Sequence, residues 1–148
     1  MTELKRTKDL AELLKWRREV IATVFEKEPD ASLMAENEDY YLHHLADNTH
    51  LAFIAIHDGE EAGCGSICLT DELPSPDNPT GRCGYLMNIY VRKAFREKGV
   101  GHSIVKKLIE EARAKDCHKI YLETTSIGRS LYESLGFRDL PDMMKLSE

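Results

Sequence analysis

The run Tyr85-Leu86-Met87-Asn88-Ile89-Tyr90-Val91 is followed, after a short charged segment, by Arg96-Glu97-Lys98-Gly99-Val100-Gly101. The first run favours a β-strand, and the residues after Gly101 have the apolar spacing of an amphipathic helix. A helix begins with backbone N–H groups that have no partner inside the helix, so an anion can bind there. Glycines allow positive φ and a close approach of the backbone, while Arg96 and Lys98 add positive charge. We therefore predict that this loop binds a pyrophosphate.

Two common phosphate-binding motifs do not fit the loop. The dinucleotide fingerprint needs a third glycine, and Ile104 stands in that place. The P-loop string Gly-x-x-x-x-Gly-Lys-Ser/Thr does not occur in the chain. What remains is Arg-x-x-Gly-x-Gly, from Arg96 to Gly101. The alternative without a ligand is a helix capped through glycines, with solvated charges around it.

A second segment favours one interpretation of this loop. Residues 119–125 are Lys-Ile-Tyr-Leu-Glu-Thr-Thr, and residues 131–137 are Leu-Tyr-Glu-Ser-Leu-Gly-Phe. With the glycine loop, they resemble the GCN5-related N-acetyltransferase (GNAT) family, whose coenzyme A loop is Arg/Gln-x-x-Gly-x-Gly/Ala. The family's later motif is a strand followed by a short helix closing in Leu-Tyr-Glu-x-x-Gly-Phe. The resemblance covers residues 84–138 well and rests on general layout upstream.

The resemblance implies an α+β fold, a three-layer sandwich similar to acyl-CoA N-acyltransferases. Helices would flank a mixed, mostly antiparallel sheet that contains one parallel, splayed strand pair. Periodicity and turn residues predict the elements themselves. We expect a possible first strand at 2–6, helices at 9–25 and 37–46, a hairpin of strands 51–56 and 62–69, a central strand at 84–92, a helix from Val100, a parallel strand at 119–125, a short helix at 127–135 and a last strand pair from Phe137.

Composition limits the class of protein. A chain of 148 residues with 42% hydrophobic content suits a single domain, residues 1–148, with its own core. The net charge of −6 argues against a general nucleic-acid binder. No apolar stretch is long enough for a membrane span, and the charged N-terminus is not a signal peptide. We therefore expect a cytoplasmic protein with no nucleic-acid or membrane partner.

Metal sites and disulfides are not expected. Four cysteines, at 64, 68, 83 and 117, form no Cys-x-x-Cys pair and are typical of ordinary thiols. His43 and His44 are adjacent, so they should point to different faces of a helix and chelate poorly. The proline-containing segment 71–82 is long enough to be either a lid or a disordered connection.

The resemblance also assigns coenzyme-binding residues. Ile89, Tyr90 and Val91 would offer backbone groups to the pantetheine arm, with an N–H near Val91 as an oxyanion donor. The N–H groups of Arg96, Glu97, Lys98, Gly99, Val100, Gly101 and His102 would bind the pyrophosphate. Ser103 would add a hydroxyl contact and Thr125 a further coenzyme contact, although many relatives have Asn where Thr125 stands.

Catalytic residues follow from the chemistry of attack on a thioester. The expelled thiolate needs a proton, and Tyr132 stands at the family's general-acid position. A packing role is the alternative for this tyrosine. The attacking amine must lose a proton, but residues 83–92 contain none of the carboxylates that many relatives have there. Glu123 and Glu38 are the candidate bases.

The function implied is acetyl transfer from acetyl-CoA to an amine of a small molecule or a protein. The acidic composition weakly favours a cationic acceptor, such as a polyamine or an aminoglycoside. A different class remains open, namely an acyl-CoA-binding sensor without turnover. A homodimer built through the second helix or the last strand is possible.

Overall fold

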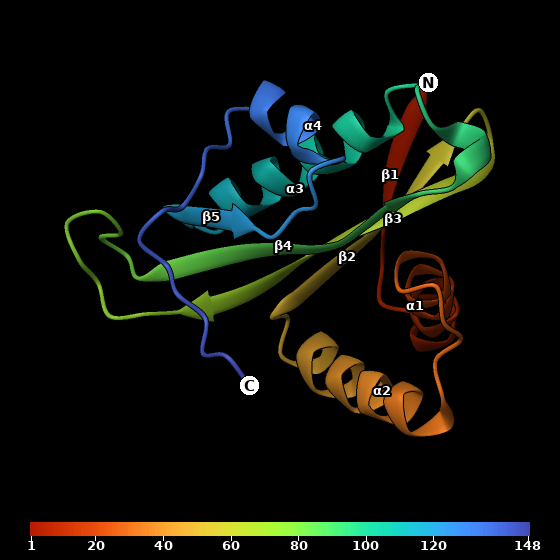
Figure 1. The fold of residues 1–148 in the computed structure, drawn as a ribbon, viewed down its shortest axis with the longest axis horizontal. Coiled ribbons are helices and arrows are strands. Elements are labelled where there is room, and N and C mark those ends of the chain that lie inside the picture. Colours follow the sequence, from red (N-terminus) through yellow and green to blue (C-terminus); the bar gives the residue numbers. More distant parts are fainter.

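The structure, a computed structural model, describes residues 1–148. One strand and two helices come first, three consecutive strands follow, and the chain ends with a helix, a strand and a short helix (Figure 1). Their bounds are β1 Thr2–Thr7, α1 Leu10–Val24, α2 Ala31–Ala46, β2 His50–His57, β3 Glu60–Asp71, β4 Arg82–Val91, the 3₁₀ turn Lys93–Phe95, α3 Val100–Ala114, β5 Lys119–Leu122 and α4 Arg129–Ser134. None of the helices combines the length and the apolar character that crossing a lipid bilayer requires.

One five-stranded sheet forms the middle layer, with its strands in sequence order from β1 to β5. The first four strands are antiparallel neighbours, whereas β4 and β5 run parallel. Because parallel neighbours need a crossover, the chain returns through α3. The predicted mixed, mostly antiparallel sheet with one parallel pair is confirmed.

Both faces of the sheet are covered. Figure 1 shows α3 and α4 on one face and α1 and α2 on the other. Strand β2 explains why, since successive side chains alternate between faces. Leu51 and Phe53 join the core beneath α3, whereas Ala52 packs with residues of α1 and α2, and Ile54 packs with residues of α1. A strand buried on both sides gives the three-layer sandwich.

The structure differs most from the sequence prediction at the start of α2 and after α4, and β5 ends at Leu122, three residues before its predicted end. Helix α2 begins at Ala31, because the carboxylate of Asp30 accepts a hydrogen bond from Leu33 N at 2.8 Å and caps the helix there. The predicted cap, Asn37, lies inside α2. The last strand pair is absent, and the chain after α4 has no regular structure. Pro141 interrupts that segment, and Met143, Met144 and Leu146 are exposed.

The segment between β3 and β4 is an ordered loop. Ser75 and Asn78 exchange two backbone hydrogen bonds, and the side chain of Asn78 is buried. Thr80 Oγ1 donates to Asp116 O at 2.8 Å, which fixes the loop against the turn after α3. None of residues 72–81 borders the main cleft, so the segment is not a lid over it.

Candidate active site

The site is centred on the second half of β4. Strands β4 and β5 pair at only four positions, from Cys83 opposite Lys119 to Leu86 opposite Leu122. Beyond Leu86, β4 continues to Val91 while β5 has ended. The backbone of residues 87–91 therefore has no strand partner on that side, although it still pairs with β3 on the other. This splayed edge offers unpaired N–H and C=O groups to a ligand.

A β-bulge changes the direction of the same segment. Cys64 and Ser66 of β3 lie opposite Tyr90 and Met87, so β4 carries one extra residue between them. Asn88 takes up the bulge with a positive φ of 56°, a conformation that asparagine tolerates better than most residues. The bulge places Ile89, Tyr90 and Val91 on the border of the cleft.

The glycine loop follows β4 after the short 3₁₀ turn Lys93–Phe95. Gly99 has a φ of +80° and serves as the N-cap of α3 without any side-chain capping bond. The backbone N–H groups of residues 97–102 donate no hydrogen bond within the protein. An added Cβ at Gly99 would meet nothing within 4 Å, so the space beside these donors is open. The geometry is that of an anion site at a helix N-terminus.

Gly101 lacks the positive φ that the sequence suggested for both glycines. It lies inside α3 with an ordinary helical φ, and an added Cβ would lie 3.2 Å from Leu131 Cδ2. The absence of a side chain therefore allows α4 to pack closely on α3. Of the predicted loop residues, Arg96 borders the main cleft, whereas the side chains of Glu97, Lys98 and His102 face solvent.

The cleft itself has a volume of about 810 Å³. It has three parts, to which we give names. The β4 floor consists of residues Tyr85 to Val91. The α4 wall, formed by α4 and the segment before it, consists of Glu123, Thr124, Thr125, Ile127, Gly128 and Tyr132. The α1–α2 wall consists of Arg17, Val20, Val24, Phe25, Glu36, Asn37, Tyr40 and Tyr41, with His50 behind it, and Arg96 completes the lining.

Tyr132 belongs to the α4 wall, as a catalytic role would require. Its ring packs against Phe137 at 5.9 Å between centroids, and its hydroxyl makes no hydrogen bond to another residue. Burial raises the pKa of Tyr132, so the phenol is protonated at neutral pH and can donate a proton. The ring of Tyr132 therefore has a packing role, while its hydroxyl is available to a ligand.

The two candidate bases are placed differently. Glu123 belongs to the α4 wall, near Tyr85; burial first, and then the charge of Glu123, raise the pKa of Tyr85 to about 12. Glu38 is exposed and does not line the cleft. Glu36, two residues earlier on α2, does line it. The structure thus brings Glu123 and Glu36, but not Glu38, to the cleft.

Comparison with known proteins agrees with this arrangement. The model of the acetyltransferase (GNAT) family matches residues 10–137. The chain belongs to the GNAT family. Among solved structures, it resembles a predicted acetyltransferase with acetyl-CoA from Clostridium acetobutylicum, with a TM-score of 0.87, 28% identity and coverage of 99% of this chain and 96% of that one.

Named relatives of this GNAT chain are longer and match a smaller part of it. Thialysine N-epsilon-acetyltransferase of Sus scrofa is 33% identical over 51% of this chain and 57% of its own length. N-alpha-acetyltransferase 30 of Xenopus laevis is 33% identical over 66% of this chain and 34% of its own length. The chain thus matches about half of the first relative and a third of the second.

The α1–α2 wall of this GNAT chain contains a network that the sequence did not reveal. Arg17 Nε donates to Asn37 Oδ1 at 3.0 Å, and Arg17 Nη1 donates to Asn88 Oδ1 at 2.8 Å. One guanidinium therefore joins α1, α2 and the bulge of β4. A signal was present, since Arg17 is a charged residue within the otherwise apolar stripe of its helix.

Neutral polar groups surround this arginine. Tyr40 Oη and His50 Nδ1 are hydrogen-bonded at 2.8 Å, and His50 Nε2 is buried without a partner. Burial lowers the pKa of His50 to about 4 and raises the pKa of Tyr40. Both groups are therefore uncharged at pH 7, and Arg17 is the one full positive charge of the α1–α2 wall.

A second connection holds α1 against the end of β4. Arg92 donates to both carboxylate oxygens of Glu19, each at 2.9 Å, and its guanidinium lies 4.2 Å from the centroid of the Trp16 ring. The hydrogen bonds from Arg92 keep the pKa of Glu19 below its usual value. Bidentate contact and stacking together fix α1 close to the glycine loop.

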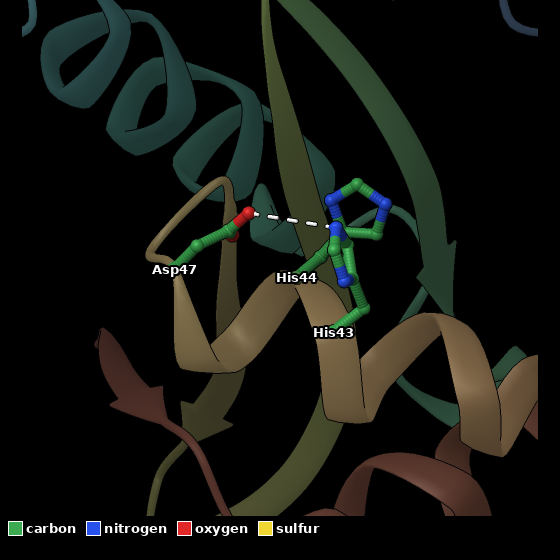
Figure 2. A group of neighbouring side chains, drawn as sticks. All are labelled: His43, His44 and Asp47. Atoms are coloured by element: carbon green, nitrogen blue, oxygen red, sulfur yellow. Dashed lines mark ion pairs between the residues drawn. The ribbon is translucent and has the colours of Figure 1, made fainter.

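The histidine pair lies apart from the cleft. Contrary to expectation, the rings of His43 and His44 are only 4.8 Å apart, and Asp47 lies beside them (Figure 2). Potential ligand atoms of the three side chains lie within 4.8 Å of one another. However, His44 Nδ1 is hydrogen-bonded to Thr49 Oγ1 at 2.6 Å, and Thr49 also donates to Asp47. The absence of a metal stays a prediction, and no residue of this group lines the cleft.

Proposed function

We propose that this protein transfers the acetyl group of acetyl-CoA to a primary amine. The observation that carries the proposal is the splayed edge of β4, which is followed, after a short 3₁₀ turn, by an α3 N-terminus with free N–H groups. The β4 edge provides backbone groups for an extended arm, and the α3 N-terminus provides N–H groups for a diphosphate. Coenzyme A carries its pantetheine arm and its pyrophosphate in the same order. Membership of the GNAT family supports the same coenzyme.

In the proposed complex, residues 97–102 bind the pyrophosphate and Arg96 adds charge beside it. Ile89, Tyr90 and Val91 hold the pantetheine arm through the splayed backbone, and an N–H near Val91 stabilises the oxyanion. Ser103 and Thr125 contribute polar contacts. The acetyl group then lies between the β4 floor and Tyr132.

The reaction in this scheme is direct attack of the amine nitrogen on the thioester carbon. The C–S bond breaks, the thiolate takes a proton from Tyr132, and the nitrogen loses a proton as the amide forms. Glu123 is our candidate for the group that receives this second proton, directly or through water. Because burial keeps Tyr132 protonated, it is suited to the acid role.

A sensor that binds acyl-CoA without turnover is the second candidate. The lack of an acidic residue in β4 favours it. The available hydroxyl of Tyr132 and the two cleft carboxylates, Glu36 and Glu123, favour catalysis. Relatives that are named acetyltransferases support the same choice.

Release of free thiol from acetyl-CoA with a panel of primary amines tests the proposal. Tyr132→Phe should reduce kcat about 100-fold with little change in acetyl-CoA affinity, because only proton donation is removed. Tyr121→Phe is the matched control. Tyr121 packs against the ring of Tyr85 but does not itself line the cleft. Acetyl-CoA binding without thiol release by the wild type would favour the sensor.

A further inference from the structure

Arg17 has no carboxylate partner, whereas three other arginines of the structure each form an ion pair. Arg92 pairs with Glu19, Arg82 with Asp116 and Arg129 with Asp139. No carboxylate lies within 4.0 Å of the Arg17 guanidinium, although this side chain is half-buried on the wall of the cleft. A half-buried cation without a counter-ion has lost hydration that no ion pair has replaced.

The existing hydrogen bonds orient Arg17 without neutralising it. Its Nε and Nη1 atoms donate to the amide oxygens of Asn37 and Asn88. Asn37 is itself fixed, because its Nδ2 donates to Leu33 O at 2.9 Å. A guanidinium has five N–H donors, and these contacts use two of them. Three donors and a full positive charge therefore remain for a ligand.

The contact with Asn88 places this charge next to the reacting centre of the proposed function. Asn88 immediately precedes Ile89, Tyr90 and Val91, the segment proposed to hold the thioester arm. Arg96, the other arginine of the cleft, lies beyond Val91, and its Nε donates to Val91 O at 3.2 Å. The two arginines are thus separated along β4 and its extension, and Arg96 is the one adjoining the pyrophosphate loop.

We propose that Arg17 binds an anionic group of the amine acceptor, so that the acceptor is an amine bearing a carboxylate or a phosphate. This inference rests on the proposed acetyl transfer. A fixed guanidinium with free donors matches the geometry of either anion. A polycation, which the acidic composition favoured, would be repelled at this point of the cleft.

Matched acceptors test the inference on the wild-type protein. The amino acids β-alanine, 4-aminobutyrate and 6-aminohexanoate are compared with their carboxamides, and phosphoethanolamine with ethanolamine, by thiol release. We expect kcat/KM to be at least 30-fold higher for the anionic member of the best pair, and to depend on chain length. The carboxylate and phosphate series then show which anion is preferred. Equal rates within every pair would overturn the inference.

Substitution of Arg17 separates binding of the anion from a structural role. Arg17→Met should raise KM for the anionic acceptor about 30-fold and change the rate with the carboxamide by less than threefold. Arg17→Lys should recover part of the loss, because it restores the charge without the fork. An arginine that only holds α1, α2 and β4 together would lower the rates of both members equally, and that result would overturn the inference.

Calorimetry with acetyl-CoA keeps the two proposals distinguishable. Arg17→Met should bind acetyl-CoA like the wild type, since Arg17 does not adjoin the α3 N-terminus. Turnover of neutral amines at wild-type rates, without preference for anions, would leave acetyl transfer standing and overturn the role of Arg17. Binding of acetyl-CoA with no turnover of any amine would count against both proposals.

Discussion

The two sides of the cleft present ligands with different kinds of groups. Beside β4 and the start of α3, the available groups belong to the backbone, namely the splayed edge of residues 87–91 and the free N–H groups of residues 97–102. On the α1–α2 wall they belong to side chains, above all Arg17, Glu36 and Asn37. Backbone groups depend on the conformation of a short stretch, whereas the side chains are assembled from distant parts of the chain.

This difference implies different tolerance to mutation. The backbone side should tolerate exchanges of exposed side chains and fail when charge or bulk enters the space beside its N–H groups. The α1–α2 wall should respond to single side-chain changes in an acceptor-dependent way. Variants on each side, with matched controls, can test the contrast.

Gly99→Asp should give the largest effect. An added Cβ at Gly99 meets nothing within 4 Å, and aspartate is one of the residues that best tolerate the positive φ of +80° at this position, so the fold should persist with some backbone strain. A carboxylate at the proposed pyrophosphate site would repel that group of the coenzyme, and we expect acetyl-CoA to bind about 100-fold more weakly in calorimetry.

Gly99→Asn is the matched control for this prediction, because asparagine has the same shape and tolerates positive φ similarly. It should weaken binding only a few-fold. Equal losses for Asp and Asn would show that strain or bulk, and not charge, disturbs the site. If neither variant weakens acetyl-CoA binding, the pyrophosphate does not bind at the α3 N-terminus.

Glu123→Gln should have an intermediate effect. If Glu123 takes the proton of the amine, its loss should lower kcat/KM at pH 7 by about tenfold or more. The deficit should shrink as the pH rises towards the pKa of the acceptor, because more of the amine is then already deprotonated. Glu36→Gln, on the opposite wall, is the control; a larger, similarly pH-dependent loss in that variant would transfer the role to Glu36.

Glu19→Gln should give the smallest effect, on stability and not on chemistry. Because the pKa of Glu19 is lowered in the folded state, its pairing with Arg92 stabilises fully above the unfolded-state pKa. This stabilisation is lost as the pH falls through the lowered folded value. We expect urea denaturation to show a loss of about 1 kcal/mol at pH 7 that fades at acidic pH.

Glu28→Gln provides the comparison for Glu19. Glu28 is 77% exposed and lies 3.7 Å from Arg18, so removing its charge should change the free energy of unfolding very little at any pH. Equal behaviour of the two variants would mean that the Arg92 contact does not fix α1 to β4.

The positions of the glycine loop and of Tyr132 in the α4 wall could largely be predicted from sequence. A glycine with positive φ before a helix and a tyrosine in Leu-Tyr-Glu-x-x-Gly-Phe are local signals, and Gly99 and Tyr132 lie where those signals indicate. Even here the prediction was incomplete. The local pattern did not distinguish Gly99, which opens space for a ligand, from Gly101, which makes room for Leu131.

The α1–α2 wall could not be predicted in the same way. The partners of Arg17 lie 20 and 71 residues away in sequence, and only the tertiary packing brings them together. Asp30 and Asn37 are both acceptable helix caps, so composition could not decide which one begins α2. That choice determines which residues of the helix, Glu36 or Glu38, reach the cleft.

The attachment of α1 has a consequence for how the cleft opens. Helix α1 is fastened at two separate points, through Arg17 to Asn88 of β4 and through Glu19 to Arg92 just after β4. Across the cleft, β5 holds β4 by four residue pairs, and α4 spans only six residues. The two walls therefore differ in stiffness, and we expect breathing motions to be concentrated in α4. Such motions would displace Tyr132, the residue that we propose as the acid, and so give an acetylated product a way out of the cleft.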